Sequence, residues 1–321
     1  MVLTVTLNPL LEKKLFFRNP VTNDNRAYKQ ELFCGGKGIN VSRQLNLLGI
    51  KNHAMTFLGG PNGKKIRSLL EYEKISFSAV NTKSESREAT IVLDEVQSKL
   101  TTYFGTNSNI STDEINSFLS KLEKSIINSS IVVFSGSVPC EEASVILEKG
   151  IELCHKYDKI SIIDTYGSFL ENIIKLGPTV IHNNLSEINA SLRQKTNTED
   201  EIENVLDFLY DNNVKLSFLT SGKSDTYAAK SDFHYKISNP EIIEKSPTGS
   251  GDAFVAGIVY GLEKSLVFSD FTILASSLGA QNASQWDACN VNYEDAKKLT
   301  SQVKIVEIGK KIKLIDDSPT I

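Results

Sequence analysis

The segment Ile131-Val132-Val133-Phe134 is the first of four short apolar runs between residues 131 and 219. The others are Ile160-Ser161-Ile162-Ile163, Thr179-Val180-Ile181 and Leu216-Ser217-Phe218-Leu219. Each interval between them is long enough for a helix, and strands that alternate with helices are joined by crossovers into a parallel sheet. The pattern therefore predicts an α/β fold with a mostly parallel central sheet.

Polar or glycine-containing segments follow each of these runs. They are Ser135-Gly136-Ser137, Asp164, Asn183-Asn184 and Ser221-Gly222. Ligands of open parallel sheets bind beyond the carboxyl ends of the strands. We therefore expect the functional residues to gather at that edge of the sheet.

The N-terminal residues 1–7 alternate apolar and small polar side chains and have neither the basic start nor the long apolar run of a signal peptide. They predict a first strand in a cytoplasmic protein. Residues 39–48 carry apolar side chains at helical spacing and are followed by Gly49, which indicates an amphipathic helix with a glycine stop. Since no 18-residue apolar stretch occurs, we expect no membrane contact.

A small additional sheet is predicted where the alternation of strands and helices breaks down. Three segments have the composition of antiparallel strands with little helix between them: residues 27–33, 90–93 and 100–104. We predict that about residues 10–34 and 86–106 form a sheet projecting from a single domain of residues 1–321. An exposed apolar face would make it a lid over a site, a homodimer contact, or both.

The composition of the chain excludes few classes of protein, but it limits the kinds of molecule that the chain can bind. The chain has 321 residues, of which 40% are hydrophobic and 23% charged, so it can bury a large core in one α/β domain or two. Its net charge of −4 argues against nucleic acid as the main partner. The four cysteines and four histidines lack the spacing of metal ligands, so we expect reduced thiols and no structural metal.

The segment Ser246-Pro247-Thr248-Gly249-Ser250-Gly251-Asp252 precedes an apolar helical pattern. The backbone N–H groups of Gly249, Ser250 and Gly251 could converge on an anion where the helix begins. The helix dipole should keep Asp252 ionised, so that it could accept a proton from a hydroxyl. The same residues also form an ordinary loop with a capping aspartate. Phe254 replaces the third glycine of a dinucleotide fingerprint, and the chain has no P-loop.

Six motifs carry a family resemblance. They are Asn8-Pro9, Asn25-Arg26, Gly35-Gly36-Lys37-Gly38-Ile39-Asn40-Val41, Ser135-Gly136-Ser137-Val138-Pro139, Asn184-Leu185-Ser186-Glu187 and Thr248-Gly249-Ser250-Gly251-Asp252. Their order and spacing resemble the ribokinase-like (PfkB) sugar kinases, in particular the 1-phosphofructokinase and tagatose-6-phosphate kinase branch, as far as about Asn282. The resemblance implies a three-layer α/β/α fold with a β lid and ATP-dependent phosphorylation of a sugar hydroxyl.

The resemblance assigns the acceptor side of the site. Asp252 would be the base, and Gly249, Ser250 and Gly251 would form the anion hole. Gly35, Gly36 and Lys37 would approach the sugar, with Asn40 bonding its hydroxyls, although an isolated Gly-Gly-Lys-Gly is otherwise a surface turn. A phosphate already on the acceptor would be held by Arg26, Lys37 and Arg87, with a hydroxyl from Ser137. Each of these cations taken alone would be a solvated surface charge.

The nucleotide side follows from the same resemblance. Asn184 and Glu187 would influence magnesium and phosphate binding, with Glu187 acting through water, because Mg²⁺ arrives with ATP and keeps several waters. The same pair is also an ordinary capping pattern. Ser221 and Gly222 would belong to the nucleotide loop, and Asn282 would line the adenine or ribose pocket.

Two departures from the family pattern bear on the substrate. Glu12 stands where an Asp usually holds sugar hydroxyls, and His182 replaces a lysine near the nucleotide. The leading hypothesis is an ATP-dependent kinase that converts fructose 1-phosphate to fructose 1,6-bisphosphate, with tagatose 6-phosphate as the alternative acceptor. The competing hypothesis is a degenerate, non-enzymatic sensor of sugar phosphate or nucleotide, which Glu12 and His182 alone would support.

Overall fold

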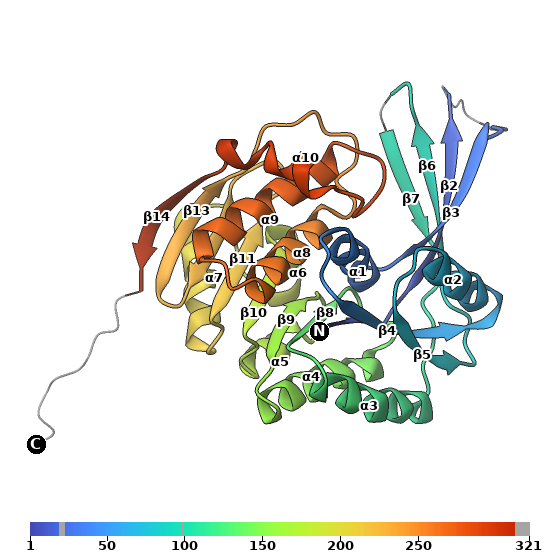
Figure 1. Cartoon of the computed structure of the whole chain (residues 1–321), viewed down its shortest axis with the longest axis horizontal. Helices are drawn as coiled ribbons and strands as arrows, with labels where there is room; N and C mark the ends of the chain where they lie inside the picture. Colours follow the sequence, from blue (N-terminus) through green and yellow to red (C-terminus); the bar gives the residue numbers. More distant parts are fainter. Residues whose placement is uncertain (19–22, 98, 312–321) are drawn as a thin grey trace, which may run out of the picture.

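The computed structural model describes residues 1–18, 23–97 and 99–311, and its main feature is a ten-stranded sheet (Figure 1). Seven neighbouring strands are parallel, in the order β5 (Phe77–Thr82), β4 (Asn52–Gly59), β1 (Val2–Thr6), β8 (Ile131–Ser135), β9 (Ile160–Asp164), β10 (Val180–Asn184) and β11 (Leu216–Thr220). Three antiparallel strands complete it: β12 (Thr226–Lys230), β13 (Phe233–Ser238) and β14 (Lys304–Lys310). The predicted mostly parallel sheet is confirmed.

Helices cover both faces of this sheet, which gives three layers. One face is packed by α1 (Lys37–Leu47), α8 (Ser250–Glu263), α9 (Phe268–Ala283) and α10 (Tyr293–Lys297). The other face carries α3 (Thr112–Ile127), α4 (Val145–Lys156), α5 (Leu170–Lys175), α6 (Leu185–Leu192) and α7 (Glu199–Asp211).

Strand β8 shows why the run Ile131–Phe134 is apolar throughout. Val132 and Phe134 point into one core, and Ile131 and Val133 point into the other. Since alternate side chains of a strand face opposite sides, a strand buried on both faces needs apolar residues at every position.

The remaining elements complete the chain trace. Helix α2 (Gly60–Tyr72) packs over the junction of the two sheets, and two short 3₁₀ segments, η1 (Glu141–Ser144) and η2 (Thr300–Gln302), lie in connections. Helix α1 ends at Leu47, and Gly49 follows with a φ of 70°, a left-handed conformation that stops the helix at the predicted glycine. None of the described helices has the length and apolar character needed to cross a bilayer.

A separate four-stranded sheet projects from the main body, as Figure 1 shows for its blue and green strands. Its order is β3 (Lys29–Gly35), β2 (Leu10–Phe17), β6 (Glu88–Asp94) and β7 (Lys99–Phe104). The ranges predicted for it include residues 19–22 and 98, which lie outside the described residues. The three segments predicted as antiparallel strands belong to β3, β6 and β7, and β3 and β7 each pair antiparallel with a neighbour, whereas β2 and β6 pair in parallel. The long connection through β4, α2 and β5 makes this parallel pairing possible.

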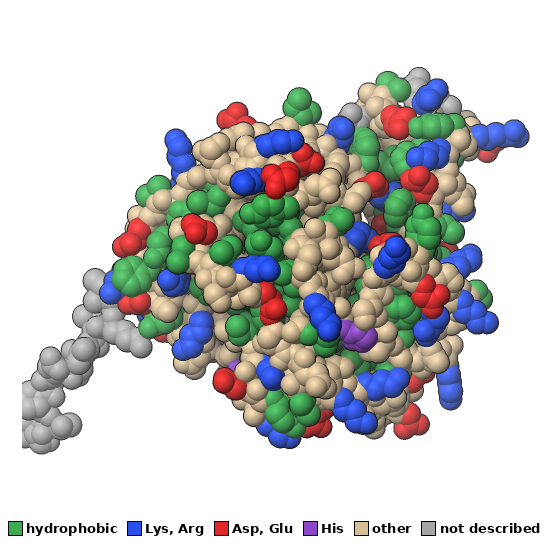
Figure 2. Space-filling model, viewed as in Figure 1, with side chains coloured by type: hydrophobic (Ala, Val, Ile, Leu, Met, Phe, Trp, Pro, Cys, Tyr) green, Lys and Arg blue, Asp and Glu red, His purple; other side chains and the backbone are tan. Residues whose placement is uncertain are grey.

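One face of the small sheet also contacts the loop of Trp286 in the main body. Trp286 packs against the cluster of Phe16, Ile91 and Leu93. The Lys14 ammonium donates to the Trp286 carbonyl at 3.3 Å and lies 3.4 Å from an Asp287 carboxylate oxygen. Figure 2 shows basic and acidic side chains interspersed over the face of the molecule that it displays.

Candidate active site

Two helix starts meet beyond the carboxyl ends of the parallel strands. Helix α1 begins after Gly36, whose φ is 119°, and α8 begins after Gly249, whose φ is 83°. A Cβ on Gly38 would lie 2.5 Å from the Thr6 hydroxyl, so only glycine lets α1 start this close to the end of β1. The glycines of both motifs therefore bring these helix starts to one edge of the sheet, as expected.

Asp252 lies in the first turn of α8 and is 5% exposed. Its Oδ2 accepts a hydrogen bond of 2.7 Å from the Asn40 side chain. Burial, followed by the negative charge of Asp164, raises the pKa of Asp252 to about 7, although Lys37 and Asn40 oppose this shift. The expectation that the helix dipole keeps Asp252 fully ionised is corrected accordingly, because burial outweighs the dipole. A general base works best when its pKa lies near the working pH.

The loop before α8 presents free backbone donors. The Ser250 N–H bonds the Pro247 carbonyl, and the Ala253 N–H bonds the Gly249 carbonyl. In the described chain, this leaves the first-turn N–H groups of Gly251 and Asp252 without a partner. Such donors at a helix start can hold an anion.

Asn282, on α9, holds this loop in place through side-chain hydrogen bonds. It is fully buried, donates to the Thr248 carbonyl at 2.8 Å and to Ser250 Oγ at 3.2 Å, and accepts from the Cys289 N–H at 2.6 Å. Both ends of its amide are thus engaged within the protein.

Asp164, at the end of β9, links several groups of the site. Its carboxylate accepts from Ser135 Oγ and His182 Nδ1, and it lies 3.3 Å from the Lys37 ammonium. Burial opposes its ionisation, but Lys37, His182 and Ser135 outweigh burial and hold the pKa of Asp164 below its usual range. The sequence marked Asp164 only as a strand-end residue.

His182 lies beneath the anion-binding loop. Its ring stacks on Phe254 with centroids 5.3 Å apart, and a Cβ on Gly251 would lie 3.1 Å from its Cε1. The buried Nε2 has no hydrogen-bond partner among the described residues. Because Nδ1 donates to Asp164, Nε2 of the neutral imidazole is an acceptor, so this buried atom is open to an O–H or N–H donor of a ligand, whereas the free N–H groups are the donors available to an anion.

Asn184 and Glu187 form the capping box of α6 and also face the site. Asn184 Oδ1 accepts from the Glu187 N–H at 2.7 Å, and Glu187 Oε2 accepts from the Asn184 N–H at 3.1 Å. The other carboxylate oxygen, Oε1, lies 2.9 Å from the Lys37 ammonium. Glu187 therefore caps α6 and also contacts the site through Lys37. The Lys37 ammonium offsets the negative charges of Glu187 and Asp164.

A second polar cluster surrounds Arg87, directly before β6. The guanidinium donates to the Asn8 carbonyl at 3.1 Å and to the Asn107 side chain at 3.4 Å, while Asn8 Nδ2 donates to Ser137 Oγ at 3.1 Å. Arg87 Nε is buried and has no partner in the part of the chain that is described. Sequence reasoning found Arg87 and Ser137 but missed Asn107, which belongs to no motif.

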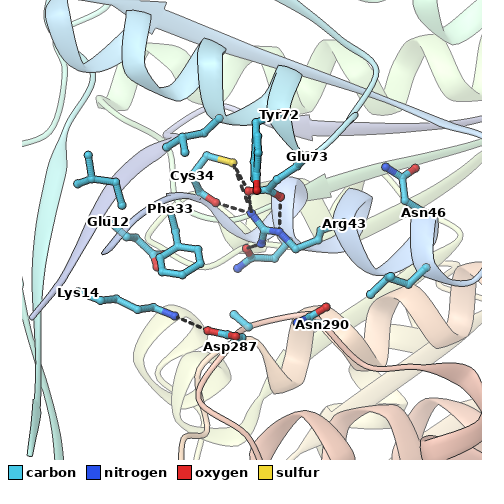
Figure 3. A pocket seen from close by; sticks show the side chains of 15 residues that line it. Glu12, Lys14, Phe33, Cys34, Arg43, Asn46, Tyr72, Glu73, Asp287 and Asn290 are labelled. Carbon is cyan, nitrogen blue, oxygen red and sulfur yellow. Dashed lines mark hydrogen bonds and ion pairs between the residues drawn. The ribbon is translucent and has the colours of Figure 1, made fainter. Parts of the chain in front are cut away.

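Glu12 lines a cavity of about 320 Å³ between the small sheet, α1 and the C-terminal end of α2 (Figure 3). A Cβ on Gly35 would lie 2.0 Å from Glu12 Oε1, so Gly35 makes room for this carboxylate. Burial raises the pKa of Glu12, against the attraction of Lys14, Arg43 and Arg87. Asn40 lines the same cavity and connects it to Asp252.

Three predicted residues lie apart from these groups. Arg26 is exposed in the segment before β3, and the hydrogen bonds and ion pairs described for the site do not involve it. Ser221 and Gly222 directly follow β11, and Gly222 has a φ of 55°.

Comparison with known proteins identifies the class of this site. Residues 6–295 match the pfkB family of carbohydrate kinases, and the chain belongs to this family. It is accordingly a phosphotransferase that acts on an alcohol, and the sensor hypothesis finds no support in the comparisons.

Two relatives show which family members this chain is similar to. It is 28% identical over 312 residues to a tagatose-6-phosphate kinase of Staphylococcus epidermidis, covering 96% of this chain and all of the relative. It is 29% identical over 314 residues to a 1-phosphofructokinase of Borreliella burgdorferi, covering 96% and 99% of the two chains.

Solved structures share the fold. A Thermotoga maritima protein described as a possible 1-phosphofructokinase superposes with a TM-score of 0.87 at 25% identity, covering 96% of this chain and 99% of that one. The Escherichia coli phosphofructokinase-2 superposes with a TM-score of 0.85 at 20% identity, covering 94% and 98% of the two chains. The predicted ribokinase-like fold is thereby confirmed.

Proposed function

We propose that this enzyme transfers the γ-phosphoryl group of ATP to a ketohexose phosphate. Fructose 1-phosphate, which would become fructose 1,6-bisphosphate, is our first choice of acceptor, and tagatose 6-phosphate is the alternative. The names of the two relatives agree with this choice. The observation that carries it is the Arg87 cluster, a partly buried cation with an unpartnered Nε close to Glu12.

A phosphate on the acceptor would complete the Arg87 cluster. Burial lowers the pKa of Arg87, and the nearby charge of Glu12 opposes that shift. The described ion pairs give Arg87 no carboxylate within 4.0 Å. A dianionic phosphate would supply the missing acceptors, with Ser137 and Asn107 as neutral partners. Arg26 is exposed, and the hydrogen bonds described for this cluster do not involve it, so we assign it no role within one subunit.

The proposed reaction needs one proton acceptor and one anion cradle. The acceptor hydroxyl gives its proton to Asp252 as its oxygen bonds to the γ-phosphorus, and the bond from that phosphorus to the leaving ADP oxygen breaks. The free N–H groups of Gly251 and Asp252, aided by the loop conformation at Gly249 and Ser250, bind the oxygens of the transferred group. Lys37 offsets part of the charge of the surrounding carboxylates.

The residues also fit a magnesium ion that arrives with the nucleotide. Among the described residues, no group of three or more His, Cys, Asp or Glu side chains could hold a metal alone. Mg²⁺ bound through phosphates and water, with Glu187 in its outer shell, is consistent with that donor set and would neutralise phosphate charge. Asn184, Ser221 and Gly222 would border the nucleotide, and Asn282 would hold the loop beside it.

The small sheet is the proposed lid and dimer contact. Tyr103 and Phe104 on its edge strand β7 are 62% and 64% exposed, which is unusual for aromatic side chains. Sedimentation velocity of the purified protein tests the contact: we expect a dimer, and a monomer at micromolar concentration would contradict it.

An acceptor panel tests the proposed substrate class. Release of ADP is measured with Mg-ATP and fructose 1-phosphate, tagatose 6-phosphate, fructose 6-phosphate or unphosphorylated fructose. We expect kcat/KM to be highest for fructose 1-phosphate. Failure of all three sugar phosphates would contradict the assignment.

The variant Arg87→Met locates the phosphate of the acceptor. It should lower kcat/KM for the preferred sugar phosphate about 100-fold, because a charge-assisted contact with the acceptor phosphate is lost. The kcat/KM for fructose, which carries no phosphate, should hardly change. Arg67→Met, at a half-buried arginine of α2 whose guanidinium donates to Asn81, is the matched control and should leave both kcat/KM values unchanged. An equal loss for both acceptors in Arg87→Met would show that Arg87 does not bind the phosphate.

A further inference from the structure

Arg43 holds three parts of the molecule together beside the cavity shown in Figure 3. It lies on α1, one turn after Asn40, and its guanidinium donates to the Glu73 carboxylate at 2.5 and 3.1 Å. It also donates to the Cys34 carbonyl at 2.6 Å and to Asn40 Oδ1 at 2.7 Å. One side chain thus joins the end of α2, the end of β3 and the carboxamide that contacts Asp252.

The contact with Asn40 fixes which end of that carboxamide faces the base. A guanidinium has five N–H donors and no acceptor, whereas a carboxamide has one acceptor end and one donor end. Because Oδ1 accepts from Arg43, Nδ2 is the atom that faces Asp252 and donates to it. If the amide were reversed, its NH₂ group would face the N–H donors of Arg43, and its carbonyl oxygen would face the carboxylate of Asp252. Both contacts would be repulsive.

We propose that Arg43 is a positioning residue for the base: it holds the Asn40 carboxamide in the orientation that donates to Asp252. Glu73 and the Cys34 carbonyl hold the guanidinium in turn, since an Arg side chain that makes one contact alone could rotate away. This inference rests on the proposed function only in its claim that Asp252 acts as the base.

The electrostatic surroundings make this hydrogen bond consequential. Asp164 and Glu187 face Asp252 and raise its pKa, as burial does, whereas Lys37 and the Asn40 hydrogen bond lower it. The Cys289 thiol also interacts with Asp252, and His182 lies behind Gly251. Loss of the Asn40 donor would leave Lys37 as the main group that favours the ionised base.

A double-mutant cycle tests the proposal without substrate. The side-chain carboxyl carbons of aspartate are labelled with ¹³C in the full chain, Asp252 is assigned with Asp252→Asn, and its titration is followed by NMR. The midpoint of about 7 should move upward by about one pH unit in Asn40→Ala and in Arg43→Met. Arg43→Met should add little in the Asn40→Ala background, because Arg43 acts through Asn40.

Two further variants separate positioning from charge and folding. Arg43→Lys keeps a cation for Glu73, but the shorter, unforked side chain cannot reach three groups at once. The titration midpoint of Asp252 should therefore also rise in this variant. Arg67→Met removes a half-buried arginine of α2 that lies outside the Asn40–Asp252 contacts, and it should leave the midpoint unchanged. An unchanged midpoint in both Arg43 variants, or full additivity in the cycle, would overturn the proposal.

The pH dependence of turnover gives a second readout. In Arg43→Lys the acid limb of kcat/KM should move to higher pH, with activity largely recovered above it, whereas a merely structural defect would lower activity at every pH. If the unaltered enzyme turned over none of the acceptors, the proposed function would fail, and the NMR cycle would still decide the role of Arg43.

Discussion

At the scale of single residues, two effects compete at Asp252. The N-terminus of α8 favours the carboxylate, but a side chain only 5% exposed and close to Asp164 loses more through desolvation and repulsion. The result is a carboxyl group with a pKa of about 7, which is available as a base near neutral pH. Removing the charges around it should therefore change activity through its ionisation.

The acid limb of the pH profile is predicted from this pKa. Since only ionised Asp252 accepts a proton, kcat/KM should fall about tenfold per pH unit below a midpoint near 7. Lys37→Met removes a cation whose charge lowers the pKa of Asp252, so the acid limb of this variant should lie at higher pH. A profile that is flat between pH 5 and 8 in the unaltered enzyme would contradict the role of Asp252.

Sequence motifs identified the residues that carry unusual local conformations or short-range patterns. Gly36, Gly249 and Asp252 belong to such patterns and lie where the sequence predicted. Asp164 was expected near the site only because it follows a strand, and Asn107 and Arg43 were missed, because the roles of all three depend on contacts with residues far away in the chain. Asn40 and Asp252, for instance, are separated by 212 positions, and no local pattern records their hydrogen bond.

At the scale of elements, the buried parallel strands were predictable and the sheet edge was not. Strands β8, β9, β10 and β11 are apolar because helices cover both of their faces. Strand β12 has the sequence Thr-Tyr-Ala-Ala-Lys, and β14 carries several exposed residues, so neither shows a strong apolar run. Their pairing with neighbours defines them, and pairing cannot be read from a single segment.

Hydrogen exchange tests the small sheet as a lid. We expect amides of β2, β3, β6 and β7 to exchange more slowly when fructose 1-phosphate is bound, because closure over the acceptor restricts local opening. Strands β8 and β9, buried in the central sheet, serve as the internal reference and should not change. Unchanged exchange in the small sheet at saturating acceptor would argue against a lid.

At the scale of the whole molecule, the small sheet meets the main body both at its base, where Leu11 and Cys34 pack with residues of α1 and α2, and at the loop of Trp286. Trp286 packs against the apolar face of the small sheet, and Lys14 bonds the same loop. Trp286 is also the single tryptophan of the chain. It therefore reports on the contact between the two parts without any added label.

Tryptophan fluorescence should follow closure of the small sheet. The emission of Trp286 should shift when fructose 1-phosphate is added, since movement of the sheet changes the surroundings of the indole. Trp286→Phe is the control, and it should abolish the signal while retaining an aromatic ring in the cluster. Constant emission at an acceptor concentration that saturates turnover would show that the contact does not move.

The most direct test of the central claim follows the product with and without the base. With Mg-ATP and fructose 1-phosphate, ³¹P NMR should show fructose 1,6-bisphosphate and ADP formed by the unaltered enzyme. In Asp252→Asn, the rate should fall by about 10² to 10⁴-fold while acceptor binding, followed by thermal stabilisation, persists. Bisphosphate formation at an undiminished rate in Asp252→Asn would contradict the account.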